Sequence, residues 1–275
     1  MPLLHIVILA IVQGISEFLP ISSSGHLILT HHLLGNSGNM WDETLTMDIA
    51  VHVGTLAAII LYCRKDIIAM LQGCLRVATG QTKDVREVKL VGFLLVGSIP
   101  VLALGLVLHL LEPAWARSLP VAAWSLIIFG IALGLADRFM PTTRTVETLG
   151  FKDAVLIGLA QMLALIPGTS RSGITMTAAR ALGFSRLEAA RFSFLLATIS
   201  ISAAGAIGIL DLLANPNAAM LFDVAVGVIV AFLAALGAVH FLMKWLTSHS
   251  FLPFVIYRVL LGIVLLVLIH NGVLA

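Results

Sequence analysis

Six apolar stretches, each close to the length of a membrane crossing, constrain this chain more than any other feature of its sequence. They are residues 47–63, 90–111, 119–136, 192–213, 222–245 and 254–270. A helix needs about 20 predominantly apolar residues to cross the hydrocarbon core of a bilayer. Inside lipid only helices and closed barrels satisfy their backbone hydrogen bonds, and these stretches are continuous rather than alternating. The sequence therefore predicts an all-α polytopic membrane protein with six transmembrane helices.

The composition agrees with a single integral-membrane domain over residues 1–275. Hydrophobic residues make up 60% of the sequence and charged residues only 11%. No segment is polar enough to form a separate soluble domain, and residues 1–12 lack the basic start and the small-residue cleavage site of a secretory signal peptide. We therefore expect membrane lipids as partners and no nucleic acid.

Two further hydrophobic stretches, residues 1–34 and 153–183, are interrupted at their centres by polar residues, proline and glycine. The first interruption, residues 13–26, reads QGISEFLPISSSGH, and the second, residues 159–173, reads LAQMLALIPGTSRSG. The apolar halves on either side are about ten residues long, which is too short for a crossing. Such stretches fit re-entrant helical hairpins, whose irregular tips are tolerated only where protein or water satisfies the backbone.

The two interruptions match when one is shifted by 148 residues along the chain. The shift places Gln13, Ser22, Ser23, Ser24, Gly25, Leu34 and Gly35 on Gln161, Ser170, Arg171, Ser172, Gly173, Leu182 and Gly183. Each half, about residues 1–140 and 150–275, therefore contains one hairpin followed by three crossings. Because three is odd, the second half must enter the membrane from the opposite face. This predicts an inverted-topology repeat whose hairpins meet near the midplane.

Basic residues are distributed unequally between the two sides of the predicted membrane domain. One side receives Arg64, Lys65, Arg76, Lys83, Arg86, Lys89, Arg138, Arg144, Lys152, Arg180, Arg186, Arg191 and Lys244. The opposite side receives Arg117 alone. By the positive-inside rule the crowded side, including a loop at residues 64–89, is cytoplasmic. We therefore expect a multi-pass protein of a bacterial inner (cytoplasmic) membrane, with both termini and the active-site opening toward the periplasm.

The first interruption combines groups that suit anion binding and proton transfer. Gln13 and Glu17 are four residues apart and share a helix face. Pro20 ends that helix, and residues 22–25 offer hydroxyls and free backbone N–H groups at the start of the next one. A helix start of this kind is an anion site.

The second interruption repeats this design and adds the guanidinium of Arg171, the side chain best suited to bidentate capture of a phosphate. Two facing helix starts with hydroxyls and one buried arginine together predict a cradle for a phosphate or diphosphate. The candidate phosphate-binding residues are Ser22, Ser24, Gly25, Thr169, Ser170, Arg171, Ser172 and Gly173.

Glu17 and His26 are the candidates for handling a proton or a metal ion. A carboxylate beside Gln13 could hold a divalent cation that bridges phosphate oxygens. Ser23, near His26, could act as an activated nucleophile, or the pair could orient water, and the residues leave both routes open.

Three other polar residues lie within predicted crossings. Asp48 and His52 are four residues apart on the first crossing, share a face, and could support the site residues from behind. Arg258, in the last crossing, is expected to reach a membrane interface by extending its side chain.

The two motifs, in this order and at this separation inside a six-span chain, resemble the bacterial undecaprenyl-diphosphatase family, also called the bacitracin-resistance or BacA/UppP family. The resemblance runs over essentially the full length. It implies removal of the terminal phosphate of undecaprenyl diphosphate, which yields the monophosphate carrier lipid used in cell-wall (peptidoglycan) synthesis. It also implies a divalent cation, Mg²⁺ or Ca²⁺, and bacitracin resistance on overproduction.

Carried over to matching positions, the resemblance implies catalytic roles for Glu17, Ser23, His26 and Arg171. Gln13 stands at the first acidic position of the motif, which leaves one carboxylate fewer for a metal. The cation is therefore expected on Glu17, with Gln13 as a second candidate ligand. A carrier or flippase for polyprenyl phosphate lipids is the alternative, because inverted repeats with broken hairpins are also a transporter architecture. A homodimer is compatible with the sequence.

Overall fold

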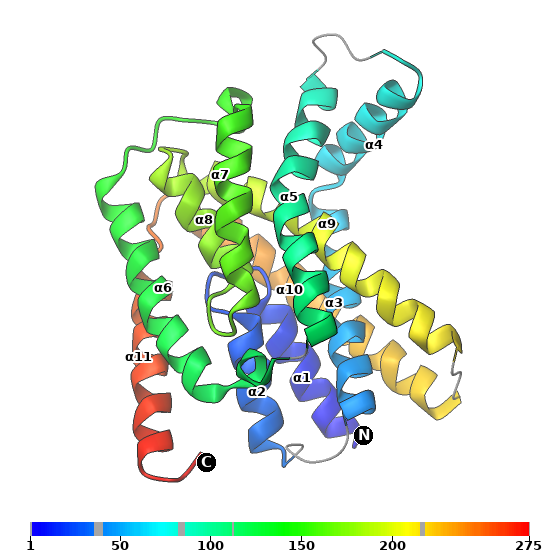
Figure 1. Ribbon diagram of the computed structural model, residues 1–275, viewed down its shortest axis with the longest axis vertical. Coiled ribbons are helices and arrows are strands. Elements are labelled where there is room, and N and C mark those ends of the chain that lie inside the picture. Colours follow the sequence, from blue (N-terminus) through cyan, green and yellow to red (C-terminus); the bar gives the residue numbers. More distant parts are fainter. Residues whose placement is uncertain (1, 36–40, 82–85, 112, 215–217, 275) are drawn as a thin grey trace.

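The computed structural model describes the chain except for residues 1, 36–40, 82–85, 112, 215–217 and 275. The described part is helical and contains no β-strand (Figure 1). Its α-helices are α1 (Leu3–Ser16), α2 (Ser23–Leu33), α3 (Trp41–Tyr62), α4 (Arg64–Ala78), α5 (Arg86–Leu111), α6 (Leu119–Phe139), α7 (Phe151–Met162), α8 (Arg171–Ala181), α9 (Arg186–Ala214), α10 (Ala218–Leu246) and α11 (Leu252–His270). Three short 3-10 helices are η1 (Ala114–Arg117), η2 (Val146–Thr148) and η3 (Leu163–Leu165).

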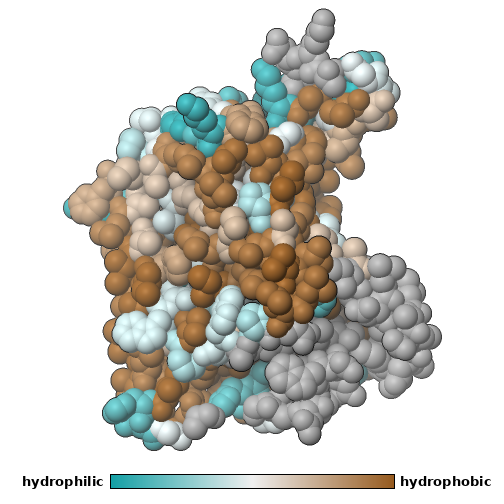
Figure 2. Space-filling view, viewed as in Figure 1, coloured by the Kyte–Doolittle hydropathy of each residue, from teal (hydrophilic) through white to brown (hydrophobic). Residues whose placement is uncertain are grey.

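The long helices confirm a polytopic membrane protein. Helices α5, α6, α9, α10 and α11 are each long and apolar enough to cross a membrane. The segment Met47–Tyr62 of α3 meets the same test together with α4, from which it is bent by 89°. The six predicted crossings therefore all correspond to helices. Figure 2 shows hydrophobic side chains over most of the visible flank, with hydrophilic residues gathered toward its upper and lower ends.

Helix α4 corrects the prediction of a loop over residues 64–89. Ile68, Leu71 and Leu75 recur at helical spacing and are 52%, 64% and 65% exposed, so they form an apolar stripe on one face. Helices that lie in the membrane interface are typically amphipathic and carry basic residues on their polar face. Helix α4, which turns away from a crossing, has this pattern. The loop prediction was wrong because the charged residues of this segment concealed the stripe.

Both interrupted stretches form helix–turn–helix hairpins, α1–α2 and α7–α8, as predicted. Helices α2 and α8 each begin after a serine, Ser22 or Ser170, with a φ of 77° or 71°. Non-glycine residues seldom adopt positive φ. Each of these serines also caps its helix, because its Oγ accepts a hydrogen bond from the backbone N–H of Gly25 at 3.3 Å or of Gly173 at 3.0 Å. The same unusual cap at equivalent positions supports the repeat inferred from the 148-residue shift.

Glycines allow the two hairpins to insert deeply between the crossings. Helix α1 packs on α10 and α7 packs on α5. A Cβ on Gly14 would lie 2.7 Å from the Ala231 carbonyl oxygen of α10, and one on Gly158 would lie 2.7 Å from the Gly97 Cα of α5. Small residues permit such close approach of helix backbones in membranes. In Figure 1 both termini lie at one end of the bundle and α4 lies at the other.

Candidate active site

The tips of the two hairpins touch each other inside the bundle. The Gly168 N–H donates to Ser24 Oγ at 3.3 Å, and Ser172 Oγ donates to the Leu19 carbonyl oxygen at 3.0 Å. A Cβ on Gly168 would lie 2.1 Å from the Ala122 carbonyl oxygen of α6, and its φ is +85°. Only glycine fits this approach. The sequence elements predicted to form one site are therefore in direct contact.

Glu17 is the centre of the hydrogen-bond network at this contact. Its side chain is 5% exposed, and its Oε1 accepts a hydrogen bond from Arg171 Nη2 at 2.5 Å. Its Oε2 accepts from Gln13 Nε2 at 2.8 Å and from Ser23 Oγ at 2.7 Å. The structure thus brings together Glu17, Ser23 and Arg171 of the four predicted catalytic residues, together with Gln13.

Four side chains of the two motifs carry buried polar atoms that have no hydrogen-bond partner within the described part of the chain. They are Arg171 Nη1, Thr169 Oγ1, Gln13 Oε1 and, at the position equivalent to Gln13, Gln161 Oε1. Such atoms are uncommon in folded proteins, because a buried polar group without a partner is destabilising. Arg171 Nη1 and Thr169 Oγ1 can donate to the oxygens of an anion, whereas Gln13 Oε1 can bind a cation or a donor.

The predicted phosphate-binding serines fall into two groups. Ser22, Ser170 and Ser172 are buried and their hydroxyls bond to the hairpins themselves. Ser23 and Ser24 are more accessible. The first turns of α2 and α8, whose N–H groups and dipoles favour an anion, both lie at the tips.

His26 lies on α2 but bonds away from Glu17. Its Nδ1 is 2.6 Å from the Ser22 carbonyl oxygen and its Nε2 is 2.6 Å from the hydroxyl of Tyr257 on α11. A carbonyl oxygen only accepts, so Nδ1 carries the proton, and in the neutral ring Nε2 accepts from Tyr257. Among the hydrogen bonds of the described residues none joins His26 to Ser23, so the structure does not form the pair considered from the sequence.

Arg258 corrects the expectation that its side chain reaches an interface. It is 0% exposed and lies between the two tips. Its Nη2 donates to the Thr169 and Gly168 carbonyl oxygens at 2.7 and 3.1 Å, and its Nη1 donates to the Pro20 carbonyl oxygen at 3.4 Å. Arg258 therefore joins both turns. The signal that could have found it is a charge in the middle of an apolar crossing, which marks a functional position by default.

His52 lies directly beside Glu17, whereas the sequence led us to expect that it supports the site residues from behind. Its Nε2 is 3.6 Å from Glu17 Oε2, and its Nδ1 is 2.6 Å from the Asp48 carbonyl oxygen. The Asp48 side chain instead bonds His31, with Oδ1 2.8 Å from Nε2. His52 therefore approaches the site, whereas Asp48 bonds His31 through its side chain and His52 through its carbonyl oxygen.

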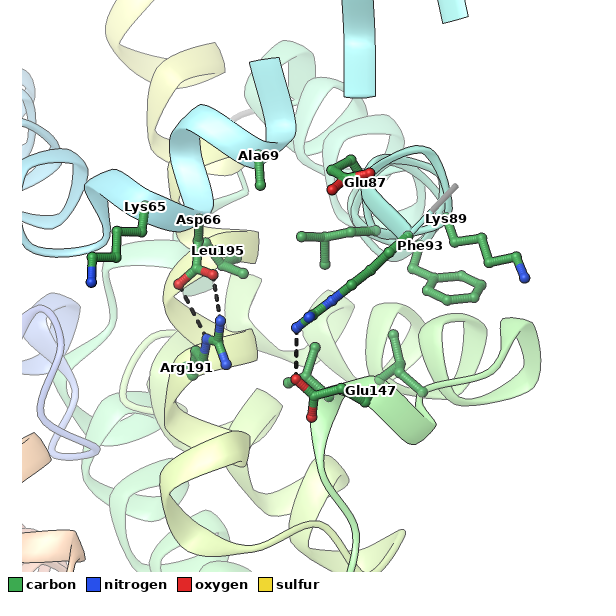
Figure 3. A pocket seen from close by; sticks show the side chains of 13 residues that line it. Lys65, Asp66, Ala69, Glu87, Lys89, Phe93, Glu147, Arg191 and Leu195 are labelled. Atoms are coloured by element: carbon green, nitrogen blue, oxygen red, sulfur yellow. Dashed lines mark hydrogen bonds and ion pairs between the residues drawn. The ribbon is translucent and has the colours of Figure 1, made fainter. Parts of the chain in front are cut away.

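A cavity of about 450 Å³ lies elsewhere, among α4, α5, α9 and η2 (Figure 3). Its charges are mainly paired: Arg191 Nη2 is 2.5 Å from Asp66 Oδ1, and Arg86 Nη2 is 2.6 Å from Glu147 Oε1. None of the predicted site residues lines it. We therefore regard the cavity as a cleft lined by ion pairs and not as part of the candidate site.

The fold and the site define a polytopic α-helical membrane protein with a buried cluster of polar and charged side chains where the tips of its two hairpins meet. The chain belongs to the family described as bacitracin resistance protein BacA, whose model matches residues 6–264. It is 44% identical over 273 residues to the undecaprenyl-diphosphatase of Dinoroseobacter shibae, which covers 98% of this chain and 100% of the relative. It is 45% identical over 275 residues to undecaprenyl-diphosphatase 1 of Rhodospirillum rubrum, covering 99% and 97%. For the undecaprenyl-diphosphatase of Hahella chejuensis the identity is 44% over 268 residues, covering 97% and 98%.

Proposed function

We propose that this protein is an enzyme of the membrane that hydrolyses undecaprenyl diphosphate to undecaprenyl phosphate and inorganic phosphate. This activity returns the carrier lipid to cell-wall synthesis and confers resistance to bacitracin. The names of the relatives and the family support this proposal. The observation that carries it is the buried Arg171 Nη1, which has no hydrogen-bond partner among the described residues and sits on a guanidinium fixed by Glu17.

The diphosphate binds where the two tips meet. Arg171 Nη1, Thr169 Oγ1 and the backbone N–H groups at the starts of α2 and α8 donate to its oxygens. The ion pair between Arg171 and Glu17 orients the guanidinium before the substrate arrives. The polyprenyl tail lies among membrane lipids, along the apolar flank of the bundle (Figure 2).

Ser23 is the nucleophile of the proposed reaction, because its hydroxyl proton is already directed at Glu17 Oε2. Glu17 takes this proton while Ser23 Oγ attacks the terminal phosphorus, and the bond from that phosphorus to the bridging oxygen breaks. Undecaprenyl phosphate leaves, and Arg171 stabilises the charge on the transferred group. Water then displaces the phosphate from Ser23, which recovers its proton from Glu17.

A divalent cation, Mg²⁺ or Ca²⁺, is part of the proposal. Within the described residues no three His, Cys, Asp or Glu side chains converge on one metal position. Glu17 and the buried Oε1 of Gln13 nevertheless fit a cation whose remaining ligands are substrate oxygens. When bound, the ion neutralises charge on the diphosphate.

The proposed location is a bacterial inner membrane, with both termini and the opening of the site facing the periplasm. The excess of basic residues at the opposite end supports this orientation. A carrier of polyprenyl phosphates is the second candidate function, because two broken hairpins that meet inside the bundle also suit alternating access.

Release of inorganic phosphate from undecaprenyl diphosphate by the purified protein tests the proposal. We expect Arg171→Ala to lower the rate at least about 100-fold, as loss of a transition-state donor does. Arg138→Ala is the matched control, because Arg138 is exposed, and it should retain the wild-type rate. Equal rates in both variants would rule out the assignment of Arg171. Movement of the headgroup across a liposome membrane without phosphate release would favour the carrier.

A further inference from the structure

His52 approaches the carboxylate of Glu17 and has no part in the proposed reaction. Its Nδ1 lies 2.6 Å from the Asp48 carbonyl oxygen, so Nδ1 carries the proton of the neutral ring. Its Nε2 lies 3.6 Å from Glu17 Oε2. In the neutral ring a lone pair on Nε2 faces a carboxylate oxygen, and two such acceptors are stabilised by a positive charge between them, which is either a proton on Nε2 or a metal ion.

The spacing of these two atoms suits a shared ion. A distance of 3.6 Å is too long for a hydrogen bond. Neighbouring ligands of octahedral Mg²⁺, each 2.0–2.1 Å from the metal, stand about 3 Å apart. The separation of Nε2 and Oε2 is close to this value, so only a small movement would bring both onto one ion.

Gln13 supplies a second, independent indication. Its side chain is 0% exposed, and its Oε1 has no hydrogen-bond partner within the described residues. Its Nε2 donates to Glu17 Oε2, so the amide lies beside the same oxygen. Rotating the Gln13 amide by a half-turn keeps its shape and places Oε1, in the position of Nε2, beside Glu17 Oε2.

We propose that His52 Nε2 is a ligand of the divalent cation, together with Glu17 Oε2 and Gln13 Oε1. This inference rests on the cation requirement in the proposed function, and it adds a residue that the motifs did not assign to the metal. Arg171 bonds Oε1 of Glu17, whereas Ser23 Oγ bonds Oε2, so the cation shares Oε2 with the proposed nucleophile and the guanidinium stays on the other oxygen. The His52 side chain is 31% exposed, which leaves the ion a route to Nε2.

A nitrogen ligand changes which ions the site prefers. Imidazole suits transition ions, whereas Ca²⁺ is bound almost entirely through oxygen. We therefore expect Mn²⁺ to bind more tightly than Ca²⁺. Replacement of His52 by alanine should reduce the affinity for Mn²⁺ more than the affinity for Ca²⁺.

Mn²⁺ binding without substrate tests this inference. The full-length protein, stripped with a chelator, is titrated with Mn²⁺, and pulsed electron paramagnetic resonance reports ¹⁴N coupling from a coordinated imidazole. We expect ¹⁴N coupling in the wild type. We expect His52→Ala to lose it and to bind Mn²⁺ at least about ten-fold more weakly, at the lower end of what loss of a metal-supporting group costs. His52→Gln should bind Mn²⁺ without ¹⁴N coupling.

Two histidine variants serve as controls for this measurement. His26→Ala and the exposed His109→Ala should both keep the ¹⁴N coupling and the Mn²⁺ affinity of the wild type. Bound Mn²⁺ without ¹⁴N coupling, coupling that survives in His52→Ala, or no Mn²⁺ binding at all would overturn the inference. Phosphate release by the wild type is measured separately, so a failure of His52 as a ligand is distinguishable from a failure of the proposed reaction.

Discussion

Arg171 and Glu17 belong to different hairpins, and each is held in place by the other. Arg171 Nη2 bonds Glu17 Oε1 at 2.5 Å, while Arg171 Nη1 has no hydrogen-bond partner within the described residues. Removing one member of a buried ion pair leaves the other charge without compensation, which is strongly destabilising. At the scale of the residue, the same pair therefore joins the two hairpins and leaves one buried donor of Arg171 for the substrate that we propose.

His26, for which the resemblance implies a catalytic role, has no step in the proposed transfer to Ser23, and its bond to Tyr257 allows an additional acid–base role of His26 to be tested. Tyr257→Phe removes the hydroxyl that lies 2.6 Å from His26 Nε2 and leaves the ring in place. We expect kcat to fall about ten-fold, within the range of acid–base positioning effects, with little change in KM. The pH–rate profile should also shift, because the substitution removes the hydroxyl that donates a hydrogen bond to the neutral ring of His26.

Tyr62→Phe is the matched control for this substitution, since Tyr62 is the other of the two tyrosines in the chain. It should keep both the rate and the pH profile of the wild type. A Tyr257→Phe enzyme with an unchanged pH profile would show that the hydroxyl has no influence on His26.

The motifs predicted the residues around Glu17 but not those contributed by α11. Ser23 and Gln13 lie within six residues of Glu17, so local spacing was enough to group them. Tyr257 is 231 residues from His26, and Arg258 is 238 residues from Pro20. The charge of Arg258 inside an apolar crossing marks its position, but local spacing does not give the partners of either residue, because these contacts arise from the packing of α11 against the two tips.

At the scale of the element, close contact between helix backbones fixes the depth of each hairpin. Gly158 of α7 faces the backbone of Gly97 on α5, and Gly14 of α1 faces Ala231 on α10. The break in each apolar stretch was predictable because ten apolar residues cannot cross a bilayer. The sequence could not predict which glycine faces which crossing, because that depends on the helix against which each hairpin packs.

Gly158→Ala should destabilise the second hairpin. A Cβ at this position would lie 2.7 Å from the Gly97 Cα and carbonyl oxygen, and backbone cannot move aside as a side chain can. We expect a loss of about 1–3 kcal/mol in the free energy of unfolding, as in overpacked cores. Thermal unfolding in detergent measures it as a lower Tm.

Gly92→Ala provides the comparison on α5, the helix against which α7 packs. No atom lies within 4 Å of a Cβ built at Gly92 of α5, so alanine should leave Tm unchanged or raise it through its higher helix propensity. Equal Tm values for Gly158→Ala and Gly92→Ala would contradict the packing of α7 on α5.

At the scale of the whole molecule, an odd number of crossings in each half predicts that both ends of the chain lie on the same side. Both termini lie at one end of the bundle and α4 lies at the other (Figure 1). The apolar runs predicted the crossings and the basic residues predicted their direction. Helix α4 escaped prediction because its apolar stripe is narrow and is easily mistaken for part of a charged loop.

The cysteines allow the orientation to be measured. Cys74 is exposed on α4, whereas Cys63 is buried. A membrane-impermeant maleimide should label Cys74 in inverted membrane vesicles and not in intact cells. In a Cys74→Ala background, Val273→Cys, at a position that is 64% exposed near the C-terminus, should show the reverse. Labelling of Cys74 from outside intact cells would reverse the proposed orientation.

The central claim is that the two hairpins form one catalytic unit, and a double-mutant cycle on phosphate release tests it most directly. Rates are measured for Glu17→Gln, Arg171→Ala and the double variant with undecaprenyl diphosphate. Residues that act as a unit are strongly non-additive. We therefore predict that the double variant is no slower than the slower single variant. A double variant whose loss equals the product of the two single losses would contradict the claim, because Glu17 and Arg171 would then act independently.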